Sequence, residues 1–129
     1  MKKILIVHAK YYKDISKRLS ASAIEVLRKE KIKKWDLIEV PGVFEIPVVI
    51  SKNIKKYDGF IALGCVIKGE TPHFDFISQA ATNAIMKLSI DYKKPIGNGI
   101  ITCLTKKQAY ERKEKGGESA KAVISVLYL

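Results

Sequence analysis

The sequence predicts an α/β fold of three layers, α/β/α, in which helices cover both faces of a four-stranded parallel sheet. Short, continuous apolar runs alternate along the chain with longer amphipathic segments. The runs are apolar at successive positions, which is typical of strands that are buried on both faces of a parallel sheet. Such a sheet binds ligands at the carboxyl ends of its strands, so we expect the loops that follow the strands to carry the function.

The expected elements follow one another in a regular order. The apolar runs predict strands over residues 3–7, 35–40, 60–67 and 96–104. Amphipathic periodicity predicts helices over residues 14–31, 44–56, 72–92, 106–113 and 118–129. Pro47 falls in the first turn of its helix, where a missing N–H does little harm. We expect Gly116-Gly117 to interrupt the helical region at the end of the chain.

The length and the apolar segments indicate one domain that does not enter a membrane. A chain of 129 residues fits a single domain over residues 1–129. The apolar run before His8 covers only 4–7, shorter than the roughly 7–15 residues of a signal-peptide core. No run approaches the roughly 20 apolar residues of a membrane span. We therefore expect a cytoplasmic protein.

The two cysteines, Cys65 and Cys103, both lie within apolar runs. Without a secretion signal, buried free thiols are favoured over a disulfide. Two cysteines and two distant histidines also lack the spacing of metal ligands, so we expect no metal.

The formal net charge of +11 requires an interpretation. A nucleic-acid-binding face gathers its basic residues, usually with arginine prominent. Here lysines predominate and are scattered in pairs, such as Lys33-Lys34 and Lys106-Lys107, mostly at the ends of elements. This pattern favours a lysine-rich surface with a general attraction for anionic metabolites, and nucleic acid is the minority alternative.

The loop after the third strand, residues 68–71, leads directly into a helix. Pro72 suits the first helical position, which makes Thr71 the expected N-cap. Unpaired N–H groups and the helix dipole favour an anion there, and Gly69 permits close approach of a ligand, so a phosphate or carboxylate seat is plausible. His73 follows in the first turn, where it either exchanges protons near pH 7 or only bonds nearby backbone. Asp75 either complements the helix dipole or orients His73.

Two further loops place aromatic residues at strand ends. Phe44 and Glu45 follow the second strand, and Tyr11 follows the first. A Phe–Glu pair there could stack on a flat heterocycle and bind its donors; the alternative is core packing for Phe44 and helix-start charge for Glu45. The predicted sheet brings all three loops to one rim, which favours a binding role.

Two long motifs identify a family resemblance. Residues 41–47, PGVFEIP, and residues 62–76, ALGCVIKGETPHFDF, resemble in sequence, order and spacing the PGAFEIP and ALGxVIxGxTxHxDxV motifs of lumazine synthases. The similarity extends to the first strand with its aromatic loop, to the fourth strand and to residues 108–112. The resemblance implies a flavodoxin-like fold and the penultimate step of riboflavin synthesis, without cofactor or metal. In that step 5-amino-6-(D-ribitylamino)uracil condenses with 3,4-dihydroxy-2-butanone 4-phosphate, and phosphate and water are released.

The resemblance also implies roles for individual residues. Tyr11 matches an aromatic residue that stacks on the pyrimidine, usually phenylalanine in the family. The segment that holds the ribityl chain and the ring corresponds to Val43, Phe44 and Glu45. The strand end whose backbone reads the pyrimidine edge corresponds to Cys65, Val66 and Ile67.

The phosphate and the proton are assigned in the same way. Glu70 and Thr71 match the pair that seats the phosphate, with Arg112 as its charged partner. His73 matches the proton donor, and Lys115 resembles a lysine near the phosphate. Two rival interpretations are a flavodoxin-like module that holds a flavin without catalysis, and a basic nucleic-acid-binding domain. His73 together with Arg112 favours the enzyme.

This sequence departs from the family pattern at two places that concern assembly. Asn98 stands where many members have a phenylalanine that contacts the ring from a neighbouring subunit, so hydrogen bonding could replace stacking. Residues 112–117 are shorter than the corresponding linker of members that build sixty-subunit shells. We therefore expect a homo-oligomer, a pentamer or a decamer made of two pentamers, with active sites at subunit interfaces.

Overall fold

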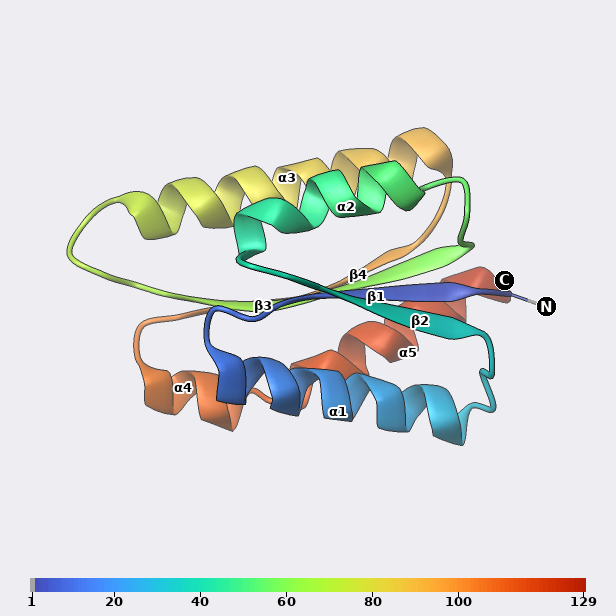
Figure 1. Cartoon of the computed structure of the whole chain (residues 1–129), viewed down its shortest axis with the longest axis horizontal. Helices are drawn as coiled ribbons and strands as arrows, with labels where there is room; N and C mark the ends of the chain where they lie inside the picture. The colour runs from blue at the N-terminus through green and yellow to red at the C-terminus, as the bar shows by residue number, and fades with distance from the viewer. Residues whose placement is uncertain (1) are drawn as a thin grey trace.

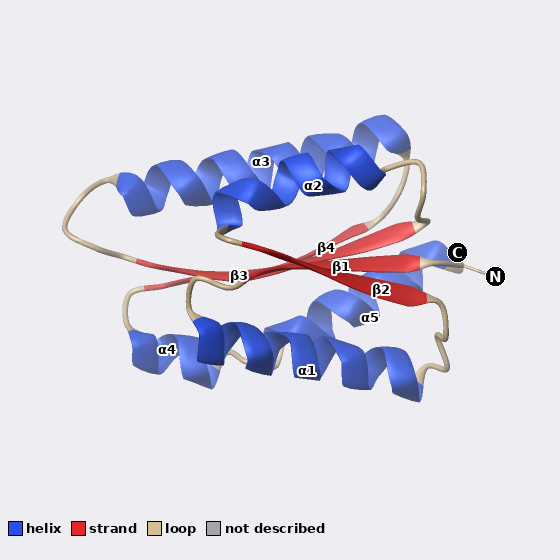
Figure 2. Cartoon of the chain, viewed as in Figure 1, coloured by secondary structure: helices blue, strands red, loops and turns tan. Residues whose placement is uncertain are grey.

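A computed structural model, which describes residues 2–129, consists of a twisted parallel sheet between two layers of helices (Figure 1). Figure 2 shows the strands as a single central layer. The elements follow in the order β1 (Ile4–Ala9), α1 (Lys13–Lys29), β2 (Trp35–Val40), the 3-10 turn η1 (Val43–Glu45), α2 (Ile46–Asn53), β3 (Gly59–Ile67), α3 (His73–Tyr92), β4 (Ile96–Cys103), α4 (Lys106–Glu111) and α5 (Lys115–Leu127).

The four strands lie in the order β2-β1-β3-β4 and every neighbouring pair is parallel. The chain runs from β1 to β2 on one side and then crosses to β3 on the other, so the topological switch point lies between β1 and β3. Helices α2 and α3 cover one face, and α1, α4 and α5 cover the other (Figure 1). The predicted three-layer α/β fold with four parallel strands is confirmed.

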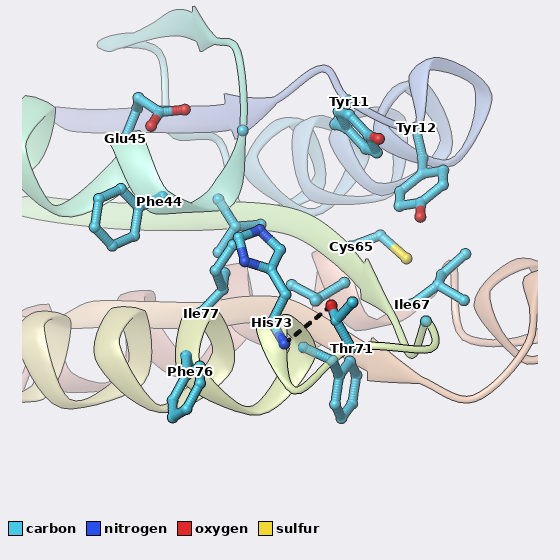
Figure 3. Close-up of a pocket in the computed structure, with 15 residues that line it drawn as sticks. Tyr11, Tyr12, Phe44, Glu45, Cys65, Ile67, Thr71, His73, Phe76 and Ile77 are labelled. Carbon is cyan, nitrogen blue, oxygen red and sulfur yellow. Dashed lines mark hydrogen bonds between the residues drawn. The ribbon is translucent and has the colours of Figure 1, made fainter.

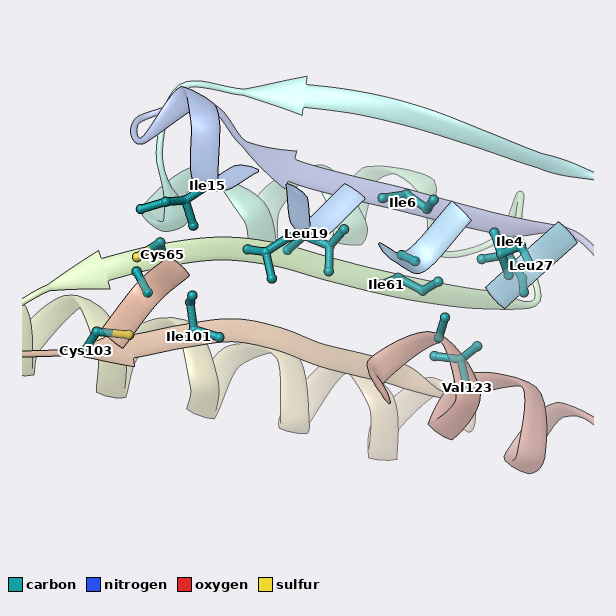
Figure 4. Packing of buried hydrophobic residues seen from close by; sticks show 14 residues of the cluster. Ile4, Ile6, Ile15, Leu19, Leu27, Ile61, Cys65, Ile101, Cys103 and Val123 are labelled. Carbon is teal, nitrogen blue, oxygen red and sulfur yellow. The ribbon is translucent and has the colours of Figure 1, made fainter. Parts of the chain in front are cut away.

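The core consists of two apolar layers, one on each face of the sheet. Ile4 and Ile6 of β1 pack toward α1 and α5, whereas Leu5 and Val7 pack toward α2 and α3. Figure 4 shows the first layer, in which Leu19 and the other apolar residues of α1 meet the strands. Because consecutive side chains of a strand point to opposite faces, a continuous apolar run is what burial on both faces requires.

The expected strands agree with the structure to within two residues at each end, but two helical regions differ from expectation. The helix expected over residues 44–56 is divided into η1 and the shorter α2, with Pro47 in the first turn of α2 as expected.

The prediction that Gly116-Gly117 interrupts the last helical region is wrong. Both glycines lie in the first turn of α5, where they face α1. A Cβ on Gly116 would collide with the carbonyl oxygen of Leu19, and the Gly117 N–H donates to Ser22 Oγ at 2.8 Å. The glycines therefore permit two helices to approach closely; they do not break one.

Gly116→Ala is expected to lower the free energy of unfolding by about 2–3 kcal/mol, because α5 must move away from α1 to admit the methyl group. Chemical denaturation of the two proteins measures the difference. Gly69→Ala is the matched control, since a Cβ at Gly69 meets nothing within 4 Å, and it should change stability by no more than about 0.5 kcal/mol. Equal stability of the two variants would contradict the close-approach explanation.

Candidate active site

A cleft of about 630 Å³ opens at the carboxyl ends of β1 and β3, beside the topological switch point. Three loops contribute to it: the loop between β1 and α1, the loop that carries η1, and the loop between β3 and α3 (Figure 3). Its lining comprises Tyr11, Tyr12, Gly42, Val43, Phe44, Glu45, Cys65, Val66, Ile67, Gly69, Thr71, His73, Phe74, Phe76 and Ile77. The loops expected to meet at one rim therefore do so.

The floor of the cleft is the end of β3, and a glycine lets η1 rest on it. A Cβ on Gly64 would lie 2.7 Å from Val43 Cγ2 and 3.2 Å from Ala9 Cβ, so any larger residue would push η1 away from β3 and crowd the end of β1. Val43 is buried at this contact, and Phe44 and Glu45 follow it at the wall of the cleft. This packing fixes the position of the whole η1 loop relative to β3.

Aromatic side chains surround the mouth of the cleft and are largely open to solvent. Tyr11 is 75% exposed, Phe44 62% and Phe76 67%. The alternative that Phe44 packs in the core is thus wrong. Tyr11 and Tyr12 meet edge to face with their ring centroids 4.9 Å apart. Exposed rings in a concave site are suited to stacking on a flat ligand.

The start of α3 brings His73 into the cleft. The helix begins at His73, one residue later than expected, so its N-cap is Pro72 and the expectation that Thr71 is the N-cap is wrong. The Thr71 hydroxyl accepts the His73 backbone N–H at 3.4 Å, a long bond that still satisfies one free donor of the helix end. Figure 3 shows the His73 ring directed from the helix start into the cleft. Its imidazole is exposed and accessible to a bound ligand.

The neighbouring carboxylate has a different position. Asp75 lies in the first turn of α3 and is exposed. Within residues 2–129 no hydrogen bond joins it to His73, which favours the interpretation that Asp75 complements the helix dipole.

Three of the expected site residues lie outside the cleft of a single chain. Glu70 is exposed in the loop but does not line the cleft, whereas its neighbours Gly69 and Thr71 do. The Asn98 Oδ1 accepts the Ile100 N–H at 3.1 Å on β4.

Arg112, just beyond α4, donates from Nη1 to the Thr102 carbonyl oxygen at 3.1 Å. Lys115, the other basic residue considered for the phosphate, lies at the start of α5, with Nζ 3.9 Å from Glu118 Oε2.

Sequence reasoning did not assign a binding role to several residues that line the cleft. Phe76 and Ile77 lie three and four positions after His73, so helical periodicity places them on its side of α3, and this spacing was the available signal. Tyr12 was visible as a second aromatic residue in its loop. Gly42 and Phe74 lie within the two motifs but carried no distinguishing signal of their own.

The floor of the cleft stays uncharged near neutral pH. Burial raises the pKa of the Cys65 thiol to about 12, and the adjacent Cys103 adds to the shift. The pKa of Tyr12 is raised as well, by burial first and then by Tyr11 and Cys65. Both cysteines are free and buried, as expected. Cys65 is therefore a thiol, not a thiolate nucleophile, and the exposed group suited to proton transfer is His73.

Two other features bear on the class of site. Among residues 2–129, no three or more His, Cys, Asp or Glu side chains are grouped so that they could hold a metal ion. In the same part of the chain, no helix is both long and apolar enough to span a bilayer.

The fold and the cleft define a class of protein: an α/β protein with a cleft at the carboxyl ends of a parallel sheet, the usual place for a small-molecule site in this class, lined by aromatic side chains and a histidine. Comparison with known proteins is more specific. Residues 1–129 match the family described as 6,7-dimethyl-8-ribityllumazine synthase. The chain belongs to this family, which confirms the resemblance seen in the two motifs.

Curated relatives with the name 6,7-dimethyl-8-ribityllumazine synthase align along nearly the whole chain. The protein of Bartonella bacilliformis is 42% identical over 135 aligned positions, which cover 98% of this chain and 88% of the relative. That of Bartonella tribocorum is 41% identical, with coverage of 98% and 88%. The protein of Agrobacterium fabrum is 40% identical, and the alignment covers 98% of this chain and 93% of the relative.

In the Cys103→Ala variant, which leaves Cys65 as the only thiol, alkylation by iodoacetamide at pH 8 is expected to be more than about a hundredfold slower than in the same chain under denaturant. Burial, the largest cause of the raised pKa, remains in this variant. Because burial keeps the folded-state pKa of the Cys65 thiol above that of a free thiol, the rate in the folded variant should rise only at a pH above the range in which a free thiol ionises. Equal alkylation rates in the folded and denatured chains at pH 8 would contradict the conclusion that Cys65 is a buried, protonated thiol.

Proposed function

We propose that this protein condenses 5-amino-6-(D-ribitylamino)uracil with 3,4-dihydroxy-2-butanone 4-phosphate to give 6,7-dimethyl-8-ribityllumazine, phosphate and water, the penultimate step of riboflavin biosynthesis. The observation that carries the proposal is the aromatic-lined cleft with His73 at its wall, in a chain of this family. The relatives' names give the product of the reaction.

The proposed seat of the pyrimidine lies between the aromatic rim and the end of β3. Tyr11 and Phe44 stack on the ring, and Val43 and Glu45 hold the ribityl chain. The backbone at the end of β3 binds the polar edge of the pyrimidine through Cys65, Val66 and Ile67. The rim offers flat apolar surfaces and the strand end offers amide and carbonyl groups, which are the two kinds of contact that such a heterocycle needs.

The proposed phosphate seat is the loop before α3. Thr71 and Glu70 lie where the first N–H groups of a helix of 20 residues point outward, and the positive end of the helix dipole favours an anion. Arg112 provides the paired N–H donors that suit a phosphate. Because Arg112 lies away from the cleft of its own chain, we propose that it serves the cleft of a neighbouring subunit.

The proposed chemistry demands little covalent participation from the protein. The substrate amine itself attacks the ketone carbonyl, so no Schiff-base lysine is required. The cleft aligns the two substrates, an effect that contributes several kcal/mol in favourable cases. His73 transfers protons during imine formation and phosphate elimination, which typically accelerates such steps about 10²- to 10⁴-fold.

We propose that the chain forms a pentamer or a pair of pentamers with active sites between subunits. A stripe of α3 supports this: Phe76, Met86 and Ile90 are exposed on the same side of the helix, an apolar face of the kind that a protein partner covers. The positions of Asn98 and Arg112 outside the cleft also support it.

Mass photometry of the 14.5 kDa chain should find pentamers or decamers at nanomolar concentration. A monomer at all concentrations would contradict the shared-site proposal. A shell of about sixty subunits would contradict the assembly inferred from the short segment before Gly116.

The direct test of function is to mix the purified chain with both substrates and to follow the fluorescence of the lumazine. His73→Ala is expected to lower kcat about 10²- to 10⁴-fold with little change in melting temperature, because the ring is exposed. Lys29→Ala, an exposed change in the last turn of α1, outside the cleft and away from the apolar stripe of α3, is the control and should keep full turnover. Full turnover by His73→Ala would remove the assigned role; a bound yellow ligand without product would favour a binding module.

A further inference from the structure

His8 is a buried polar residue that the proposed chemistry does not use. It lies in β1 opposite Glu39 of β2, on the face of the sheet that α1 covers. Its Nδ1 is 2.5 Å from Ser20 Oγ of α1, and its Nε2 is 3.0 Å from Glu39 Oε2. Both ring nitrogens are therefore engaged, each by a different element of the fold.

The residue types Ser, His and Glu also occur in hydrolase triads, but the surroundings of this group exclude such a role. The Ser20 side chain is buried between α1 and the sheet and does not line the cleft. A substrate carbonyl therefore has no path to its oxygen. What the group does is connect three elements: α1, β1 and β2.

A second connection joins the same helix to the end of β1. The Ser16 hydroxyl donates to the carbonyl oxygen of Ala9, and the Ser16 N–H donates to Tyr12 O at 2.9 Å. At the other end of the loop, the Lys10 N–H donates to Val40 O at 2.9 Å. Between these bonds only residues 10–12 separate β1 from α1, and this loop carries Tyr11 to the mouth of the cleft.

The orientation of α1 consequently decides where the loop lies. The helix packs on the sheet through Leu19 and the other apolar residues of its buried face, contacts that do not depend on direction and that tolerate small rotations. Hydrogen bonds depend on direction. Ser20 is in the second turn of α1, close to the loop. Its bond to His8 therefore fixes both the rotation of this end of α1 about the helix axis and its distance from the sheet.

Glu39 completes the connection by holding the imidazole. Its carboxylate accepts a hydrogen bond from Nε2–H, and in that tautomer Nδ1 accepts the hydrogen bond of the Ser20 hydroxyl. Glu39 is half exposed at the edge of the sheet, so it can be replaced without creating a cavity in the core.

We propose that the Ser20–His8–Glu39 group is a positioning device that holds the loop of residues 10–12, and with it Tyr11, in place to stack on the pyrimidine substrate. The proposal rests on the function proposed above. His8 acts through the backbone and does not touch the substrate.

The test compares two serine-to-alanine changes on one helix. Ser20→Ala removes the bond to His8, whereas Ser22→Ala removes a bond to the Gly117 N–H on the far side of α1 and leaves β1 untouched. Ser20→Ala is expected to raise KM for the ribitylaminouracil about tenfold, the equivalent of one buried hydrogen bond, with KM for the butanone phosphate within about twofold. Ser22→Ala should leave both KM values within about twofold of those of the native chain, even if it lowers the melting temperature as much as Ser20→Ala does.

A second pair of variants probes the other end of the device. Glu39→Ala should reproduce the rise in KM for the pyrimidine substrate, and Glu39→Gln, which retains an acceptor for Nε2, should restore it. The proposal is overturned if Ser20→Ala and Ser22→Ala change KM alike, or if Glu39→Ala leaves KM unchanged.

Hydrogen–deuterium exchange, which needs no substrate, separates this proposal from the proposed function. Amides of residues 9–16 should exchange faster in Ser20→Ala than in the native chain or in Ser22→Ala, because the bonds from Lys10 to Val40 and from Ser16 to Tyr12 open more often once α1 is no longer held by His8. Equal exchange in all three proteins overturns the positioning role. If the native chain forms no lumazine while exchange follows the prediction, the function fails and the positioning of the loop stands.

Discussion

Burial of β1 and β3 on both faces is the constraint on which the rest of this structure depends. β1 is buried along its whole length, and β3 along most of its length. Two strands of this kind require a layer of helices on each side, which accounts for the three layers and for the two apolar cores. With both faces covered, a ligand has access only where strands end and loops begin.

Small residues set how closely the loops and helices approach the strands. Gly64 brings η1 onto β3, and Gly116 brings α5 onto α1. The first of these contacts fixes the position of η1, which lines one side of the cleft. The floor of the cleft is uncharged, since burial keeps the Cys65 thiol protonated, and the titratable side chains of Glu45 and His73 lie at its walls. This distribution suits a heterocycle held flat and a phosphate held at the rim.

The sequence alone predicts most of the fold, because a strand buried on both faces consists of a continuous run of apolar residues. The strand expected over residues 35–40 has the same bounds in the structure. The meeting of three loops at the cleft follows from the rule that ligand sites of parallel sheets lie at the carboxyl ends of the strands. The expectation that Gly116 interrupts a helix is wrong, because the sequence does not distinguish a glycine that ends a helix from one that lets a second helix approach closely.

What the sequence could not give depends on partners distant along the chain. The motifs indicate Asn98, Glu70 and Arg112, but only the coordinates show that all three lie outside the cleft of their own chain. The bond from His8 to Glu39 follows from strand register, which no local pattern specifies.

The central claim is that one cleft needs residues of two chains, His73 from one and Arg112 from its neighbour. Mixed assemblies of the His73→Ala and Arg112→Ala chains test it most directly, because each chain keeps the group that the other lacks. Reassembly of equal amounts should restore up to about a quarter of native turnover, since a heterologous interface pairs each cleft with a single neighbour. Activity no higher than the sum of the two separate variants would contradict the claim and would place both groups in the service of the same chain.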